Sequence, residues 1–242
     1  MIQISSLYKS FHGQPVLNGV TLEVPQGGIT VILGASGQGK TVLLKHIIGH
    51  HRPDRGKVLV DGVDINLLNE REKNEFRKRF GMLYQGAALF DSMTVGENVA
   101  FPLREHTKLS EREITLKVGG FLEMVGLNGI EAKMPSELSG GMRKRVGLAR
   151  AIALQPKIIL YDEPTTGLDP ITTTQINRLV LEMQKKLRIT SVIISHDIES
   201  TFAVADQVAM LHEGKIIEVA PPELFRSSRH PFVKQFLAKE PV

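Results

Sequence analysis

The fold of this chain is decided by one stretch of eight residues, Gly34-Ala35-Ser36-Gly37-Gln38-Gly39-Lys40-Thr41. It matches the pattern Gly-x-x-x-x-Gly-Lys-Thr, whose glycines let successive backbone N–H groups point at phosphate oxygens. Lys40 supplies a positive charge for the β- and γ-phosphates, and the Thr41 hydroxyl is placed to bind Mg²⁺. The stretch therefore predicts a phosphate-binding loop.

The residues on either side of this loop have the pattern that such a loop requires. Residues 29–33 are rich in Val and Ile and predict a strand, while residues 42–48 predict a helix. A loop between them lies at the positive end of the helix, which favours bound phosphate.

A second strand ending in acidic residues supplies the groups that a phosphate loop needs beside it. Residues 158–161 form a continuous apolar run, as expected of a parallel strand buried on both faces. Asp162 follows at its carboxyl end and could bind Mg²⁺ through water, while Glu163 could accept a proton from an attacking water. The alternative is a strand end that carries two surface acids.

The remaining pattern predicts an α/β fold of the P-loop NTPase type, with a mostly parallel core sheet, an antiparallel β subdomain and an α-helical subdomain. Residues 1–220 are expected to form the ATPase domain, with the helical subdomain at about 90–150. Residues 221–242 are expected to form a short helical C-terminal tail. This tail is expected to pack on its own domain, and the alternative is a clasp on a second copy or a regulatory subunit.

The local predictions include strands at 16–24 and 57–60, helices at 70–79 and from Ser110, a strand at 190–194 and a hairpin at 207–219.

Composition excludes several classes of protein. The 242 residues include no cysteine, so disulfides and thiolate metal sites are ruled out. The net charge of +4 is too small to indicate nucleic-acid binding by itself. No apolar run approaches the ~18 residues of a membrane helix, and residues 1–6 do not resemble a secretory signal.

Residues 137–142, Glu-Leu-Ser-Gly-Gly-Met, resemble the signature of the ATP-binding cassette (ABC) transporter ATPases. The other motifs of that family stand around it in the family's order. Gln85 resembles the Q-loop glutamine, Asp169 in Gly-Leu-Asp the D-loop, and His196 the switch histidine. Phe11 resembles the aromatic residue under adenine, with Tyr8 as its rival.

The resemblance implies ATP and Mg²⁺ as cofactors and an enzyme that hydrolyses ATP. It places Thr41, Gln85 and Asp162 at the metal, and it makes His196 a partner of the γ-phosphate that orients Glu163. It also implies a homodimer, in which the N–H groups of Ser139, Gly140 and Gly141 cap the γ-phosphate held by the phosphate loop of the second copy.

Met142 stands where the family usually has glutamine. A signature ending in methionine and followed by basic residues is similar to the phospholipid-trafficking branch, the Mla and MCE systems, and residues 86–95, 98–106 and 134–138 resemble the same branch. The branch implies phospholipid transport between inner and outer membranes through an integral membrane permease. It further implies an MCE-domain protein and a small regulatory subunit as partners, and a place on the cytoplasmic face of the inner membrane.

Two alternatives stay open from the sequence. The cargo could be an amino acid, a lipoprotein or an organic solvent. The chain could instead be a DNA- or ribosome-associated ABC ATPase, but it lacks the long insertions of such proteins. Four basic residues after the signature are expected to be solvated or interface charges rather than a nucleic-acid patch: Arg143, Lys144, Arg145 and Arg150.

Overall fold

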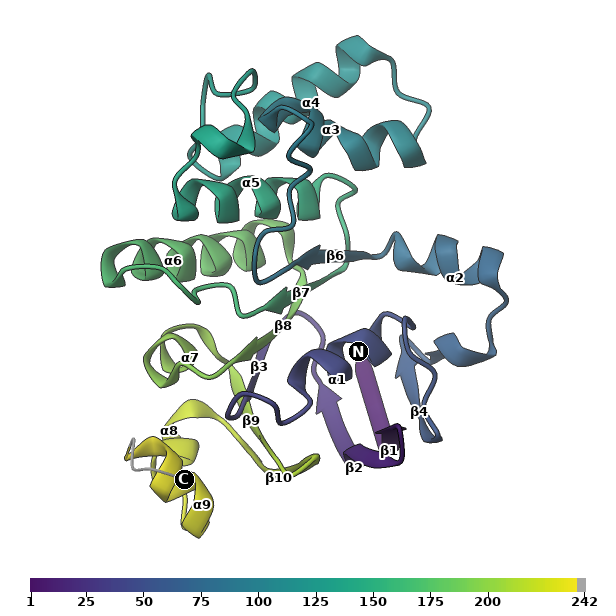
Figure 1. Cartoon of the computed structure of the whole chain (residues 1–242), viewed down its shortest axis with the longest axis vertical. Helices are drawn as coiled ribbons and strands as arrows, with labels where there is room; N and C mark the ends of the chain where they lie inside the picture. The colour runs from purple at the N-terminus through teal and green to yellow at the C-terminus, as the bar shows by residue number, and fades with distance from the viewer. Residues whose placement is uncertain (239–242) are drawn as a thin grey trace. The chain divides into compact units, whose positions relative to one another are not determined.

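The computed structural model describes residues 1–238, and its backbone forms two compact units. The first unit consists of Met1–Arg77 together with the segment from Thr190, and the second of Lys78–Ile189 (Figure 1). Residues 239–242, at the end of the expected tail, lie outside the described residues.

The first unit contains an antiparallel sheet with the strand order β2-β1-β4-β5. Its strands are β1 (Ile2–Phe11), β2 (Gln14–Val24), β4 (Arg55–Val60) and β5 (Val63–Asp64). β1 is not among the strands predicted from the sequence, because a register shift between Ile4 and Leu7 breaks the alternation of buried and exposed residues. Ile4 and Leu7 both face the core, although an unbroken strand would put them on opposite faces.

A second set of strands in this unit carries the phosphate loop. β3 (Ile29–Leu33) pairs in parallel with both β8 (Thr190–Ser195) and β9 (Gln207–His212). β10 (Lys215–Ala220) pairs antiparallel with β9, which confirms the expected hairpin. Every residue of β3 is buried, as a parallel strand covered on both faces requires.

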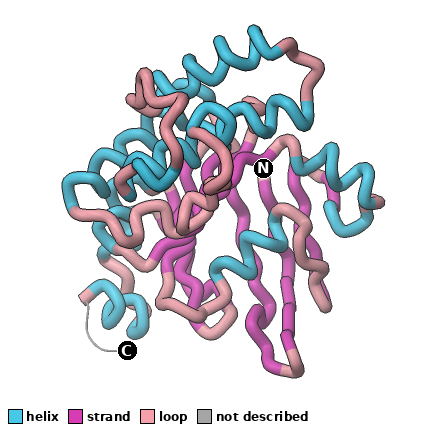
Figure 2. The backbone as a smooth tube through the Cα atoms, turned by 45° about the horizontal axis from the view of Figure 1, so that its top comes forward, coloured by secondary structure: helices cyan, strands magenta, loops and turns pink. Residues whose placement is uncertain are grey.

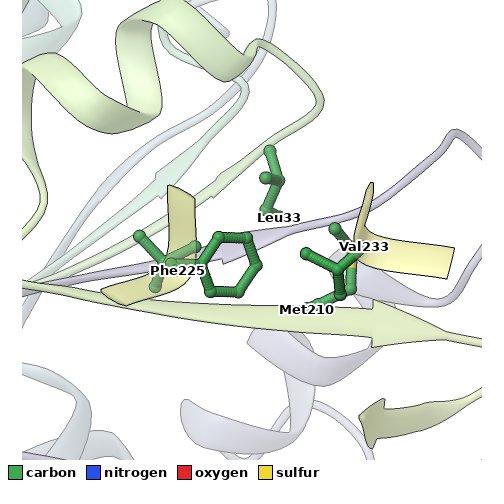
Figure 3. Close-up of a cluster of buried hydrophobic side chains, with 5 residues drawn as sticks. Leu33, Met210, Phe225 and Val233 are labelled. Carbon is green, nitrogen blue, oxygen red and sulfur yellow. The ribbon is translucent and has the colours of Figure 1, made fainter. Parts of the chain in front are cut away.

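The helices of the first unit are α1 (Lys40–Ile47), α2 (Glu70–Arg77), α7 (Ile198–Val204), α8 (Pro222–Arg226) and α9 (Pro231–Leu237), with a 3₁₀ turn at Ile65–Leu67. The last two helices end beside the C-terminal marker (Figure 2). They pack on the strands of their own unit, as the tail was expected to do. Five fully buried side chains join them to the strands, namely Leu33, Val208, Met210, Phe225 and Val233 (Figure 3).

The second unit holds two parallel strands and four α-helices. The strands are β6 (Phe80–Leu83) and β7 (Ile158–Asp162), with Leu83 opposite Tyr161. The helices are α3 (Val95–His106), α4 (Glu111–Met124), α5 (Gly140–Ile152) and α6 (Pro170–Leu187), and a 3₁₀ turn spans Pro135–Glu137. α3, α4 and α5 pack against one another, and α5 also packs on β6.

Side-chain caps fix where the helices of the second unit begin. The Ser110 hydroxyl accepts from the Glu113 backbone N–H while the Glu113 carboxylate accepts from the Ser110 N–H, so the predicted capping box is present. Thr94 and Glu97 form the same arrangement at α3. α3 lies within the helical subdomain predicted at about 90–150, and it contains Pro102, a residue that usually breaks helices.

These elements confirm an α/β fold with mostly parallel pairing beside the phosphate loop. The proposed boundaries of the ATPase domain and the tail stay a prediction. Within residues 1–238, no helix combines the length and the apolar character needed to span a bilayer.

Candidate functional site

The phosphate loop connects β3 to α1, as predicted. A Cβ atom on Gly34 would lie 2.5 Å from the carbonyl oxygen of Leu211, so only glycine fits there. Gly39 caps α1 with a φ of 95°, a conformation that disfavours other residues. Lys40 is buried, and its Nζ donates to the carbonyl oxygens of Gly34 at 2.7 Å and Ala35 at 3.0 Å. The loop thus curls around the lysine ammonium at the start of α1.

A contact from far along the chain holds the middle of this loop. The backbone N–H of Glu213, in the turn between β9 and β10, donates to Oε1 of Gln38 at 2.6 Å. His212, the next residue back, stacks on Phe232 of α9 with ring centroids 3.5 Å apart. The phosphate loop is therefore linked through one turn to the C-terminal helices.

We expect Gln38→Ala to weaken ATP binding about twofold to tenfold, because a neutral hydrogen bond contributes about 0.5–1.5 kcal/mol. Isothermal titration calorimetry on the purified protein measures this change. Gln26→Ala, in an exposed turn outside the loop, is the matched control and should bind as the wild type does. Equal affinity for the wild type and Gln38→Ala would show that the loop keeps its shape without Glu213.

His196 is brought to the same sheet edge as the phosphate loop. It is exposed and follows the last residue of β8, Ser195, whose carbonyl accepts from the Gly34 N–H at 3.2 Å. Asp197 then caps α7, its side chain accepting from the Ser200 N–H. The parallel pairing of β3 with β8 therefore places His196 next to the start of the loop.

Phe11 and Tyr8, the two candidates for stacking on the base, both belong to β1. Phe11 is half-buried, with the His51 ring edge-on at 5.4 Å and Lys9 Nζ 5.4 Å from its ring centroid. Tyr8 is 38% exposed. A half-exposed ring can still stack on a base. The assignment of Phe11 therefore stays a prediction.

In the second unit, Asp162 and Glu163 lie where β7 ends, and both are buried. Glu163 has a φ of 49°, an uncommon left-handed conformation for a residue other than glycine. The Thr166 hydroxyl donates to its Oε2 at 3.1 Å. The strained backbone turns the chain sharply at the residue predicted to act as the base.

Gln85 is exposed and follows β6, the strand paired with β7. The structure therefore brings it to the same edge of the second unit as Asp162 and Glu163. Their oxygen atoms, an amide carbonyl and two carboxylates, are ligands of the kind that Mg²⁺ prefers.

The signature residues begin α5. Ser139 is exposed and is the N-cap residue, its hydroxyl accepting from the Met142 N–H at 3.3 Å. Gly141 packs closely on α6, since a Cβ atom there would lie 2.5 Å from the Thr172 methyl carbon. The first backbone N–H groups of α5 point out of the helix end, as an anion site at a helix N-terminus requires.

Asp169 caps α6. Its carboxylate accepts from the Thr172 hydroxyl at 2.6 Å and from the N–H groups of Ile171 and Thr172 at 3.0 Å. These hydrogen bonds, the hydroxyl first among them, lower the pKa of Asp169. The structure therefore shows Asp169 as the N-cap residue of α6, while its role in the D-loop stays a prediction.

The expectation of solvated or interface charges after the signature is wrong for Lys144, whose side chain is buried within its own unit. Lys144 is only 5% exposed, and Arg150 is half-buried with its guanidinium on the carbonyl oxygens of Ala87 and Ala88. The sequence contained a signal for the burial of Lys144. This residue lies three residues after Gly141 and four residues before Leu148, and this helical spacing places all three on the buried face of α5.

Comparison with known proteins places these observations in a family. A family model described as ABC transporter matches residues 17–166. The chain is 45% identical over 236 residues to a probable ribonucleotide transport ATP-binding protein (mkl) of Mycobacterium leprae, spanning 98% of this chain and 68% of that protein. It is also 45% identical over 240 residues to the intermembrane phospholipid transport system ATP-binding protein MlaF of Haemophilus influenzae, spanning 99% of this chain and 91% of that protein.

A solved structure has the same fold. The ATP-binding cassette MJ0796, in a dimeric post-hydrolysis state bound to ADP and Pi, superposes with a TM-score of 0.84 at 29% identity. The match covers 92% of this chain and 99% of that one. With the phosphate loop, the acidic strand end and the signature all in place, this chain belongs to the ABC transporter family of ATP-binding ATPases.

Proposed function

We propose that this chain is the ATP-hydrolysing subunit of a membrane transporter that moves phospholipids between the inner and outer membranes. The observation that carries the cargo assignment is the 45% identity to the H. influenzae phospholipid transport protein, which extends over nearly the full length of both chains. Ribonucleotide transport is the second candidate, because the mycobacterial relative is equally similar but extends well beyond this chain.

The nucleotide is held by the first unit in this proposal. Lys40 moves from the carbonyls of Gly34 and Ala35 to the β- and γ-phosphates, and the loop N–H groups bind the remaining oxygens. Phe11 stacks on adenine without reading its edge.

The ligands proposed for Mg²⁺ are the Thr41 hydroxyl, the Gln85 amide and the Asp162 carboxylate. All three offer hard oxygen ligands of the kind this ion prefers. When bound, the ion neutralises charge on the phosphate oxygens.

Hydrolysis then depends on Glu163 and His196. Glu163 accepts a proton from the water that attacks the γ-phosphate, while His196 holds the γ-phosphate and orients Glu163. Gln85 contacts the attacking water and senses the γ-phosphate.

A second copy of the chain completes the site. Ser139, Gly140 and Gly141 open α5 with free helix-end N–H groups, which suit the γ-phosphate bound by the opposite copy. ATP then holds two copies together, and hydrolysis releases them.

A groove in the second unit suits a helix of the permease. It has a volume of about 440 Å³ and lies among β6, the segment after it, α3 and the end of α5. Its wall is largely aromatic: Phe90 is 42% exposed and packs on Phe101 with ring centroids 5.0 Å apart, and Tyr84 is 38% exposed. An exposed aromatic groove directly after Gln85 would transmit movement from the ATP site to the membrane partner.

Affinity purification of the tagged protein from detergent-solubilised membranes of its host tests the proposal. We expect a multi-helix permease, an MCE-domain protein, a small regulatory subunit and bound phospholipid to co-purify, from the cytoplasmic side of the inner membrane. Recovery of a permease with nucleotide, amino-acid or lipoprotein cargo would keep the ATPase and overturn the lipid assignment.

We expect Phe90→Ala to reduce permease recovery at least about tenfold, because truncating an aromatic anchor in an interface commonly costs 2 kcal/mol or more. Quantitative mass spectrometry of the same purification measures this ratio. Leu116→Ala, on the exposed face of α4 away from the groove, is the control and should recover the permease normally. Undiminished recovery with Phe90→Ala would place the permease on another surface.

A further inference from the structure

Lys144 connects two segments of the proposed catalytic apparatus. It lies on α5, five residues after the signature serine Ser139, and its side chain points into the second unit. Its Nζ donates to the carbonyl oxygen of Gln85 and, at 3.2 Å, to the carbonyl oxygen of Glu163. One ammonium group therefore joins the signature helix, the segment after β6 and the segment after β7.

Both segments that Lys144 holds have strained backbones. Glu163 has a φ of 49°, and beyond Gln85 the residues Ala87 and Ala88 have φ values of 62° and 47°. A non-glycine residue in this region costs about 1–3 kcal/mol, so the surroundings must maintain the conformation. A hydrogen-bond donor can stabilise such a conformation by holding the carbonyl oxygen of the residue in one direction.

α5 also supplies the hydrogen-bond donors for the carbonyl oxygens of the other two strained residues, Ala87 and Ala88. Arg150 donates from Nη2 to Ala87 and from Nη1 to Ala88, each at 2.8 Å. Lys144 and Arg150 lie six residues apart on α5 and together hold the carbonyl oxygens of Gln85, Ala87 and Ala88. Only Lys144 also reaches Glu163.

A buried ammonium at this position is itself costly. Burial lowers the pKa of Lys144, and the nearby carboxylates of Asp162 and Glu163 oppose that shift. An exposed surface charge would avoid this cost, and apolar packing of α5 could be achieved by a methionine of similar length. The groups that offset this cost are the carbonyl oxygens of Gln85 and Glu163 and the two nearby carboxylates.

We propose that Lys144 is a positioning residue, which fixes the backbones of Gln85 and Glu163 against the signature helix so that both side chains meet the attacking water. This inference rests on the proposed function. When the ATP-bound second copy displaces α5, Lys144 makes the segments at Gln85 and Glu163 move jointly with the helix.

The test uses the wild-type complex purified with its membrane partner and four variants of it. In Lys144→Met the apolar length is kept and both hydrogen bonds are lost. We expect kcat to fall about 100-fold, since a displacement of about 1 Å at a reacting group can cost that much. We expect KM for ATP to stay within about twofold, because the phosphate loop is unchanged.

Lys144→Arg keeps the charge and the donors, and we expect it to recover at least about a tenth of the wild-type kcat. Lys185→Met, an exposed change on α6, is the control and should leave kcat and KM unchanged. Thermal unfolding of each variant accompanies the kinetics. If Lys144→Met does not fold, the comparison of kcat between Lys144→Arg and Lys144→Gln decides the question, since glutamine retains a donor on a shorter arm.

The outcomes separate this inference from the proposed function. A wild-type complex without ATP hydrolysis would refute the function. A wild-type complex that hydrolyses ATP, with Lys144→Met within about twofold of its kcat, would refute the positioning role alone. Loss of kcat in parallel with a raised KM and a lowered Tm, without recovery in Lys144→Arg, would also refute it and reduce Lys144 to a structural residue.

Discussion

Replacing Glu163 by glutamine should give a protein that binds ATP and no longer hydrolyses it. The amide keeps the size of the carboxylate but cannot accept a proton, and general-base catalysis typically contributes about 10²–10⁴-fold to a rate. We expect kcat to fall by that factor, while the Kd for ATP stays close to that of the wild type. Phosphate release measures the rate, and equilibrium titration with ATP measures the affinity.

The same variant should accumulate as an ATP-bound dimer, because the step that releases the two copies is blocked. Size-exclusion chromatography with light scattering, with and without ATP, detects this shift. Glu105→Gln, on the exposed side of α3, is the control and should hydrolyse ATP normally. Turnover near the wild-type rate in Glu163→Gln would show that another group accepts the proton.

Replacing Phe225 by alanine should cause the largest loss of stability in the first unit. Phe225 on α8 is fully buried in the cluster that also includes Leu33, Met210 and Val233 (Figure 3). Removing a buried phenylalanine side chain costs about 3–5 kcal/mol, from lost burial and from the cavity left behind. For a chain of this size we expect the Tm to fall by about 6–20 °C.

Leu224→Ala tests the specificity of that effect. Leu224 is the adjacent residue of α8 but is 64% exposed, so its truncation should change the Tm little. Differential scanning calorimetry of both variants makes the comparison. Equal Tm values for the two would mean that the C-terminal helices do not stabilise the strands below them.

The local features of the fold could be predicted where one short pattern carries the whole signal. The phosphate loop, the strand before it and the capping box at Ser110 are such patterns, since each depends on residues close in sequence. Strand β1 was missed because a bulge interrupts its alternation, and helix α3 was predicted only as part of the helical subdomain at about 90–150, since Pro102 lies inside it. In both cases tertiary packing overrides the local pattern.

The connections within the candidate site were harder to predict. The contact between Glu213 and Gln38 joins residues 175 positions apart, and no pattern in a single sequence marks it. The buried position of Lys144 could have been read from helical spacing, but its two carbonyl partners follow strands that only the fold brings together. Candidate site residues could therefore be named from the sequence, while the contacts around them could not.

The order in which the chain is synthesised gives the position of β3 a further consequence. β3 is made early, whereas its neighbours β8 and β9 and the covering helices α8 and α9 are made last. On the ribosome, the nascent segment Ile29–Leu33 therefore carries four apolar residues and one threonine without β8 until synthesis has passed Ser195, and without β9 until it has passed His212. Non-local pairing of this kind is slow and leaves an aggregation-prone strand exposed. The phosphate loop thus acquires its final shape only near the end of translation, and a truncated chain leaves the ribosome without it.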